Sequence, residues 1–364
     1  MTPGIRRSRA RLLLRPLAVV ALAASLAACS AAATGGSPSA SAPVPTPAPP
    51  VTAPPTAAPT AQPTPDATPS PAPAFPVTLT DDEGASVTLD VRPERIVSLT
   101  PAVTETLFAL GAGDRLVANS DFDDYPALVG DLPHVASYTG VDVERVVSHE
   151  PDLVIAGGNG FNPPEAIAKL RSLGIPVVVV YADSVEGILR DIELVGTAVG
   201  AADASTTLTA WMRDRIAGIS AAATAGTGSP PAPRVFYELD ATNEIYGPAP
   251  DSFIAAMIAL AGGDPITTGD PALFAIPLET LVAADPEVIV LGDAAYGMTP
   301  EAVAQRPGWS AMTAVEAGAV RPVNDTIVTR PGPRIVDGLR ALALAIDPTL
   351  QLPEVGSPPP LPAP

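Results

Sequence analysis

The sequence predicts an α/β protein made of two related α/β units with a helical stretch between them. Short β-branched runs alternate with helical segments over 95–181 and again over 234–323. Such runs are typical of parallel strands that are covered on both faces. The segment from Asp183 to about Thr224 has no strand pattern, and its apolar residues follow helical spacing. An internal repeat relates the two units to each other.

The first 28 residues have the pattern of a signal peptide. Arginines without any acidic residue precede an apolar run, Leu17 to Ala28, that is too short to span a membrane. Small residues then lead to Cys29, the only cysteine of the chain. This arrangement is similar to the lipobox of bacterial lipoproteins, in which the cysteine is lipidated and becomes the mature N-terminus. An ordinary signal peptide that happens to contain a cysteine is the alternative.

Residues 29–74 are rich in proline, alanine and threonine. A composition so poor in large apolar residues cannot bury a core, so we expect a disordered, extended tether. The rest of the chain divides into an N-terminal α/β lobe (75–182), a bridging helical segment (183–230), a C-terminal α/β lobe (231–348) and a proline-rich tail (349–364).

The N-terminal lobe begins with a predicted hairpin over 77–89, with Asp82, Glu83 and Gly84 at its turn. A helix over 102–110 is expected to end at Gly111, because glycine favours the left-handed conformation that ends many helices. The predicted strands of the two lobes cover 95–99, 152–156, 176–181, 234–239, 287–291 and 319–323.

The composition excludes several classes of protein. The formal net charge of −19 argues against nucleic acid and anionic membrane surfaces as partners. His134 and His149, the only histidines, cannot supply a Cys/His zinc site and give a serine triad little to work with. The glycine-rich segment 157–160 lacks dinucleotide spacing, and no phosphate-loop or Gly-x-Ser-x-Gly motif occurs. We therefore expect no enzyme, no metal site and no covalent cofactor.

The internal repeat aligns 143–155 with 278–290. In each copy a glutamate precedes an apolar pair, an acid–Pro–acid turn and an apolar strand. A weaker echo aligns 109–114 with 259–264, and both of these segments place glycines at a helix end. Chance similarity between two helix–proline–strand units is the alternative. Two related lobes imply a cleft, because open α/β sheets bind ligands beyond the carboxyl ends of their strands.

Residues from Phe75 to about Asp347 resemble the substrate-binding proteins of ABC importers for cobalamin, ferric siderophores and haem. The resemblance rests on an ordered set of segments, namely RIVSLTPAVTE at 95–105, DDYP at 123–126, EPDLV at 150–154 and PRI at 333–335. It implies the class III periplasmic-binding-protein fold, in which a single long helix bridges two Rossmann-like lobes. It also implies an extracytoplasmic, lipid-anchored monomer that delivers a metal chelate to an ABC permease and its ATPase.

The same resemblance implies roles for individual residues. Glu144 and Glu279 fall where the family docks on arginines of its permease; solvated glutamates favoured by the helix dipole are the alternative. Four loop aromatics match the cleft-lining loops of the cobalamin-binding relatives, where rings suit a flat, partly apolar ligand. Asp325 is a candidate acceptor for ligand amides. Packing of the rings over the core edge is the alternative for the four aromatics, which are Phe122, Tyr138, Tyr246 and Phe274.

Cobalamin is the predicted ligand, and a ferric siderophore and haem are the alternatives. Haem carriers of this family typically use an axial tyrosine, a role open to Tyr138 or Tyr246, with His134 nearby in the sequence. The residues after Tyr138 are closer to the cobalamin and siderophore pattern. Arg330 and Arg334 are candidate partners of an anionic chelate, although a structural role at the start of the last helix is favoured for Arg334. An anchored receptor without a permease is a further alternative.

Overall fold

The computed structural model describes residues 75–226 and 231–360. The predicted signal peptide, Cys29 and the tether up to residue 74 lie outside this part of the chain. Within it, a two-stranded and a six-stranded sheet precede the helix α5 (Ala202–Gly226) in sequence, and a four-stranded sheet follows it. No helix in these two ranges is long and apolar enough to cross a membrane.

The N-terminal sheet has six strands in the order β6-β5-β4-β3-β7-β8. Neighbouring strands are parallel except at the edge, where β6 runs antiparallel to β5. Strands β3 and β7 are buried along their whole length, which explains their near-continuous apolar sequences. The strands are β3 (Ile96–Ser98), β4 (Leu116–Ser120), β5 (His134–Ser137), β6 (Gly140–Val141), β7 (Leu153–Gly157) and β8 (Val177–Val180).

The predicted N-terminal hairpin is confirmed as β1 (Val77–Thr80) paired antiparallel with β2 (Ser86–Leu89). Asp81 fastens the hairpin to the main sheet. Its buried carboxylate accepts a bond of 2.6 Å from Arg171 and one of 3.2 Å from the backbone N–H of Val179 in β8. The same carboxylate accepts the N–H of Ala85 across the hairpin turn.

The helices before α5 begin and end at recognisable signals. Thr100, Asp142 and Ser184 each cap a helix with a side-chain oxygen. The predicted end of the first helix is confirmed, because Gly111 is left-handed with φ 72°. These helices are α1 (Pro101–Ala109), α2 (Val143–Ser148), α3 (Pro164–Ser172) and α4 (Val185–Ala198), with short 3-10 turns at Gly113–Arg115 and Ala127–Asp131.

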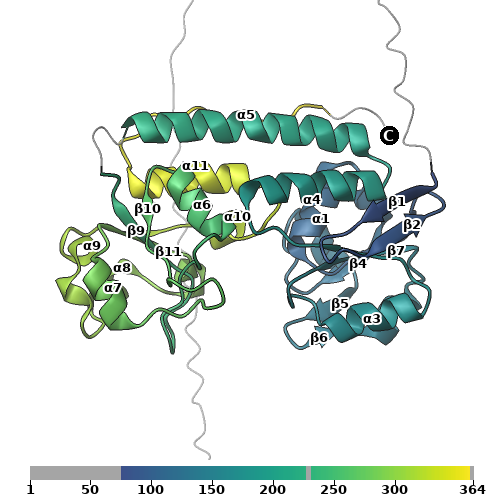
Figure 1. The fold of residues 1–364 in the computed structure, drawn as a ribbon, viewed down its shortest axis with the longest axis horizontal. Coiled ribbons are helices and arrows are strands. Elements are labelled where there is room, and N and C mark those ends of the chain that lie inside the picture. Colours follow the sequence, from purple (N-terminus) through teal and green to yellow (C-terminus); the bar gives the residue numbers. More distant parts are fainter. Residues whose placement is uncertain (1–74, 227–230, 361–364) are drawn as a thin grey trace, which may run out of the picture. The chain divides into compact units, whose positions relative to one another are not determined.

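The predicted bridging helical segment, 183–230, contains two helices. The chain turns at Gly200, which has φ 73°, between α4 and α5. Helix α4 packs against α1 and β1 of the N-terminal lobe, whereas α5 contacts α4, α6 (Phe253–Leu260) and α11 (Ile335–Ile346) (Figure 1). The long bridging helix is therefore α5 alone. The glycine at 200 divides the helical pattern because it readily adopts a left-handed conformation.

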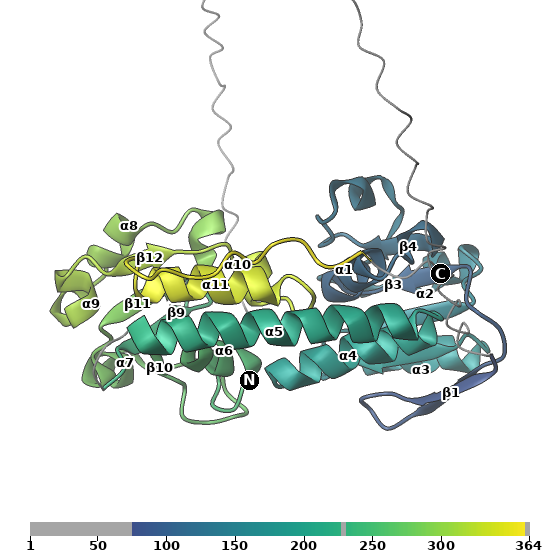
Figure 2. The same ribbon diagram turned by 90° about the horizontal axis from the view of Figure 1, so that it is seen from above.

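The C-terminal sheet has four parallel strands in the order β10-β9-β11-β12. Helix α11 covers this sheet and lies beside α5 (Figure 2). The strands are β9 (Arg234–Glu238), β10 (Asp264–Pro265), β11 (Val288–Leu291) and β12 (Val320–Pro322). The remaining helices are α7 (Leu278–Ala284), α8 (Pro300–Ala304), α9 (Thr313–Glu316) and α10 (Asp325–Val328), with 3-10 turns at Asp293–Tyr296 and Trp309–Ala311.

Both copies of the sequence repeat form the same local structure. A short helix, α2 or α7, leads through an acidic residue and a proline into a parallel strand, β7 or β11. The acidic residues Glu150 and Asp285 are both left-handed, with φ 48° and 47°. Non-glycine residues seldom adopt this conformation, so its occurrence at equivalent positions supports a true structural repeat.

An arginine clamps each of these turns. Arg95 Nε donates to the carbonyl oxygens of His149 and Glu150, at 3.1 Å each. Arg234 Nε makes the same pair of bonds in the other lobe, to the carbonyls of residues 284 and 285 at 3.0 and 2.8 Å. Each clamp satisfies carbonyl groups that a helix end leaves without partners.

The packed body extends past the predicted boundary at residue 348. Leu350 and Val355 are buried in the main core cluster, and Leu352 packs against it. Arg340 of α11 lies 3.7 Å from the carboxylate of Glu354. The tail therefore begins later than predicted, because apolar side chains beyond residue 348 pack against the core instead of facing solvent.

Candidate functional site

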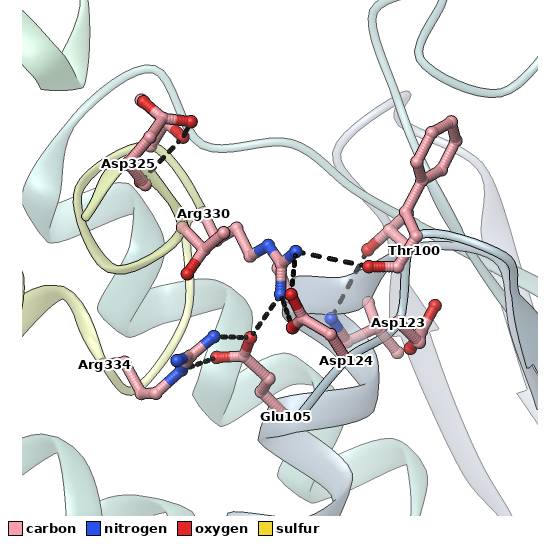
Figure 3. Close-up of polar contacts among 12 residues, drawn as sticks. Thr100, Glu105, Asp123, Asp124, Asp325, Arg330 and Arg334 are labelled. Carbon is pink, nitrogen blue, oxygen red and sulfur yellow. Dashed lines mark hydrogen bonds and ion pairs between the residues drawn. The ribbon is translucent and has the colours of Figure 1, made fainter. Parts of the chain in front are cut away.

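The two lobes are joined by a network of buried charges. Arg330, which follows α10, donates to Glu105 of α1 at 3.1 Å and to Asp124 at 2.5 Å (Figure 3). It also donates to the carbonyl oxygen of Phe122 at 3.2 Å. Arg334, just before α11, donates twice to the Glu105 carboxylate, at 2.8 and 2.5 Å. Two arginines of the C-terminal lobe thus share one glutamate of the N-terminal lobe.

Burial makes this network strong and specific. The side chain of Glu105 is only 2% exposed, and a charge so buried is stable only when it is paired. Burial alone would lower the pKa of Arg330, but Asp124 and Glu105 raise it above its ordinary value. Arg334 also lies over the Tyr125 ring, 4.3 Å from its centroid. Both arginines are therefore engaged internally, which favours the structural role for Arg334 and leaves Arg330 less available to an anionic chelate.

The network marks the place where the carboxyl edges of both sheets meet. Helix α1 follows β3, so its first turn lies at the carboxyl end of the N-terminal sheet. Helices α10 and α11 follow β12 in the C-terminal sheet. These two edges are in contact, because a Cβ at Gly332 would lie 3.3 Å from the carbonyl oxygen of Ala102. Ligands of α/β proteins bind at such carboxyl edges.

Two predicted ring residues lie on neighbouring loops of the N-terminal edge. Phe122 follows β4 and is 44% exposed, and its carbonyl accepts the bond from Arg330. Tyr138 lies in the turn between β5 and β6 and is 86% exposed. The two loops are linked, because the N–H of Asp121 donates to the carbonyl of Ala136 at 2.9 Å.

The other two predicted rings are brought together in the C-terminal lobe. The N–H of Gly247, directly after Tyr246, donates to the carbonyl of Phe274 at 2.9 Å. Phe274 is 50% exposed. Tyr246 is partly buried, and its hydroxyl donates to Glu244 at 3.0 Å. This bond to a carboxylate raises the pKa of Tyr246.

Asp325 lies in the first turn of α10, and its carboxylate has partners within the C-terminal lobe. Its two carboxylate oxygens accept bonds from the Tyr237 hydroxyl at 2.8 Å and the Thr329 hydroxyl at 2.9 Å. Tyr237 is fully buried, and burial together with Asp325 raises its pKa. Asp325 thus serves first as an internal acceptor, a role that becomes visible only once Tyr237 is placed beneath it.

Glu144 and Glu279 occupy equivalent exposed positions. Each lies in the first turn of its helix, α2 or α7. Neither side chain forms an ion pair with another residue of 75–226 or 231–360. Both carboxylates are therefore available to an external partner.

A second buried charge cluster lies at the carboxyl end of the C-terminal sheet. Glu238, the last residue of β9, accepts two bonds from Arg306, at 2.6 and 2.8 Å. Asp293 lies beside it after β11, and burial followed by repulsion from Glu238 raises the pKa of Asp293 to about 7. Sequence reasoning missed this cluster and the Glu105 network. The available signal was an acidic residue within an apolar segment, as at 105 and 238, because such a residue needs a buried partner.

One cavity lies away from the predicted rings, and another lies beside one of them. One, of about 740 Å³, is lined by residues of α4, α5 and the end of α6, and none of the predicted rings borders it. Another, of about 410 Å³, runs beside the β5–β6 turn that carries Tyr138. In the described part of the chain, no group of three or more histidine, cysteine or acidic side chains is arranged to hold a metal ion.

Residues 96–325 match the family model described as periplasmic binding protein. The chain belongs to this family. It is 33% identical over 276 residues to "Uncharacterized ABC transporter substrate-binding lipoprotein YvrC" of Bacillus subtilis (strain 168), which covers 75% of this chain and 86% of the relative. It is 35% identical over 287 residues to "Cobalamin-binding protein" of Halobacterium salinarum, which covers 75% of this chain and 74% of the relative.

Among solved structures, the chain is similar to the periplasmic heme-binding protein RhuT from Roseiflexus sp. RS-1. The TM-score is 0.61 at 27% identity, and the match covers 70% of this chain and 97% of the other. The fold is that of the class III periplasmic binding proteins, as predicted. The family is one of binding proteins rather than of enzymes.

Proposed function

We propose that this chain is the lipid-anchored substrate-binding component of an ABC importer and that its ligand is a cobalamin. The observation that carries the proposal is the set of rings at the carboxyl edges of both sheets, three of them exposed and one, Tyr246, partly buried. Phe122 and Tyr138 belong to one edge, Tyr246 and Phe274 to the other, and the Arg330–Glu105 contact joins the edges. The ligand binds between these rings.

The physical reason for placing the ligand here is that these rings expose apolar surface to water. Single exposed apolar residues are ordinary, but a cluster of them at the edge where ligands bind marks a binding surface. Rings bring large contact areas and lose little conformational entropy on binding. A corrin macrocycle, which is broad and has a polar amide periphery, suits a surface of rings interrupted by polar loop atoms.

Three observations favour cobalamin over haem. The relative from Halobacterium salinarum is named a cobalamin-binding protein. An axial tyrosine binds iron best as a phenolate, and the hydroxyl of Tyr246 instead donates to Glu244 at 3.0 Å. His134 lies in β5, whereas Tyr138 lies in the turn after this strand. His134 is also held by Asn119, whose Oδ1 lies 2.8 Å from His134 Nδ1.

Haem remains the second candidate because the structural neighbour RhuT is named a heme-binding protein. Tyr138 is the residue available for that role, since it is largely exposed and forms no hydrogen bond through its hydroxyl to another described residue.

The proposed anchor is Cys29, which lies outside the described residues. The lipobox-like segment before it and the name of the Bacillus subtilis relative, a lipoprotein, support lipidation there. Acyl chains contribute about 0.8 kcal/mol per buried methylene, so a multiply acylated cysteine holds the protein at the membrane.

The proposed docking residues are Glu144 and Glu279. Their equivalent, exposed positions in the two lobes suit a permease with two equivalent subunits. Charge pairs at the rim of an interface steer and orient the partners, and their effect weakens with salt.

The ligand is tested by absorption spectroscopy. The purified chain is incubated separately with cyanocobalamin, haemin and a ferric siderophore, and passed through a desalting column. We expect cyanocobalamin bands to elute with the protein, and the pair of substitutions Tyr138→Ala and Tyr246→Ala to weaken its retention. A Soret band with haemin and none of the cobalamin bands would overturn the cobalamin assignment in favour of haem.

Docking is tested by transport. Glu144→Ala combined with Glu279→Ala should leave the affinity for ligand unchanged and abolish uptake in cells that depend on this importer. Glu301→Ala provides the control, because Glu301 is an exposed first-turn glutamate outside the repeat. Uptake that survives the double substitution at high salt would remove both glutamates from the docking surface.

A further inference from the structure

Two exposed rings that the prediction did not include occupy equivalent places in the repeat. Phe161 follows β7, and Tyr296 follows β11. They stand at the same distance in sequence from the left-handed acids Glu150 and Asp285. Their exposed fractions, 59% for Phe161 and 88% for Tyr296, are among the highest of the large apolar side chains. The repeat therefore places one ring at the carboxyl edge of each sheet.

The loop of Phe161 is rigidly held. Asn162 is only 4% exposed; its Oδ1 accepts the N–H of Gly157 at 2.7 Å, and its Nδ2 donates to the carbonyl of Leu99 at 3.3 Å. The ring lies close to the backbone of β7, because a Cβ at Gly157 would come within 3.0 Å of Phe161 Cδ1. The exposed ring is therefore presented in a fixed place rather than on a loose loop.

The loop of Tyr296 is held in a similar way. It begins at Gly292, where a Cβ would come within 2.7 Å of the Tyr237 ring and 2.9 Å of the Glu238 carbonyl. The side chain of Asp293 is buried below it. The loop closes at Gly297, which is left-handed with φ 96°. Glycine at the strand end and a buried polar residue in the loop are thus common to both lobes.

We infer that Phe161 and Tyr296 form a second ring pair of the ligand site, one ring from each lobe. This inference rests on the proposed function and deepens it. A fixed ring costs little entropy when a ligand covers it, so rigid display of an exposed ring favours affinity. The pair suits a macrocycle that reaches both lobes at once. The hydroxyl of Tyr296 adds a donor for an amide or carboxylate on the periphery of that macrocycle, which a phenylalanine lacks.

The test is equilibrium binding of cyanocobalamin, followed by quenching of tryptophan fluorescence. Phe161→Ala and Tyr296→Ala are expected to weaken binding by about tenfold each, and the double substitution by more than either alone. Tyr296→Phe separates the hydroxyl from the ring and is expected to lose less than Tyr296→Ala. Leu173→Ala is the control, because Leu173 is a similarly exposed apolar residue at the far end of α3. Circular dichroism establishes that each variant is folded.

The outcomes separate this inference from the proposed function. If the unmodified chain binds cyanocobalamin and both ring variants bind it as tightly, the ring pair is wrong and the proposed ligand stands. If the unmodified chain does not bind cyanocobalamin, the proposed ligand fails; the same variants are then titrated with haemin. Equal haemin affinities in all variants would overturn the ring pair for that ligand as well.

Discussion

The two lobes share a scaffold and differ in how they balance the buried charges at their carboxyl edges. Each lobe has a helix–acid–proline–strand unit clamped by an arginine, Arg95 or Arg234. In the C-terminal lobe, the buried Glu238 is paired with Arg306 of the same lobe. In the N-terminal lobe, the buried Glu105 is paired with Arg330 and Arg334 of the other lobe.

This difference separates the contacts that build each lobe from the contact that joins the two lobes. The repeat builds each sheet and its turns independently, whereas the charge of Glu105 is satisfied only when the lobes are together. Removing one partner of a buried pair is costly because it leaves an uncompensated charge. The lobe junction is therefore stabilised by a contact that neither lobe provides by itself, and the candidate site lies beside it.

Glu105→Gln is expected to have the largest effect on stability, because it removes the carboxylate that pairs with two arginines of the other lobe. It leaves two partly buried guanidinium groups without the buried carboxylate of Glu105, so we expect the free energy of unfolding to fall by about 3–5 kcal/mol. Urea denaturation measures the loss. Hydrogen exchange should show reduced protection in both α1 and α11, since the pair joins these two helices.

Two further variants test whether this loss is specific to a buried contact between the lobes. Glu238→Gln breaks a buried pair within one lobe, so its loss of protection should be confined to the C-terminal sheet. Glu186→Gln removes an exposed pair with Arg213 and should cost less than about 1 kcal/mol. If Glu105→Gln behaved like Glu186→Gln, the charge network would not hold the lobes together.

Each lobe has a buried aspartate whose raised pKa should make the stability of the protein depend on pH. Burial, followed by repulsion from Asp82, raises the pKa of Asp191 in α4 to about 8, and burial followed by Glu238 raises that of Asp293 to about 7. Between an unfolded pKa of about 3.9 and these values, the folded state binds more protons. Stability should therefore fall as pH rises from about 5 to about 8, by an amount on the order of a few kcal/mol.

Denaturation at a series of pH values checks this prediction. Asp191→Asn should remove the part of the decline that extends to about pH 8, and Asp293→Asn the part that ends near pH 7. Asp214→Asn changes an exposed residue of α5 and should leave the profile unchanged. A stability that rises with pH across this range would contradict the assignment of both groups.

The smallest expected effect comes from changing the arginine that clamps the repeat turn in each lobe. Arg95→Lys and Arg234→Lys each remove the forked bonds to a helix end, so each should cost about 1 kcal/mol of unfolding free energy. The two losses should be equal within that scale, because the additional ion pairs of Arg234 are exposed and contribute little. Arg190→Lys is the control, since Arg190 is exposed and forms no hydrogen bond to a described residue. Strongly unequal losses would mean that the two clamps are not equivalent.

Local signals in the sequence were sufficient for much of the fold. The hairpin at 77–89, the helix end at Gly111 and the repeat depend on neighbouring residues, and the structure confirms them. The break at Gly200 was missed, although the glycine was visible, because a single glycine inside a helical pattern does not by itself end a helix. Phe161 and Tyr296 were overlooked for a different reason. Whether a ring is exposed depends on how the rest of the chain packs around it, and the local sequence does not show this.

The sequence by itself determined the periodic scaffold and the equivalent places of Glu144 and Glu279 in the repeat, and its composition predicts a proline-rich tether over 29–74. These features follow from composition and short-range spacing, which a single chain displays directly. Only the tertiary structure decided that Arg330 and Arg334 pair with Glu105, 225 and 229 positions away, and that Leu350 and Val355 join the core. Such contacts depend on how the chain returns across the molecule, and no local pattern records which distant charge or apolar surface it will meet.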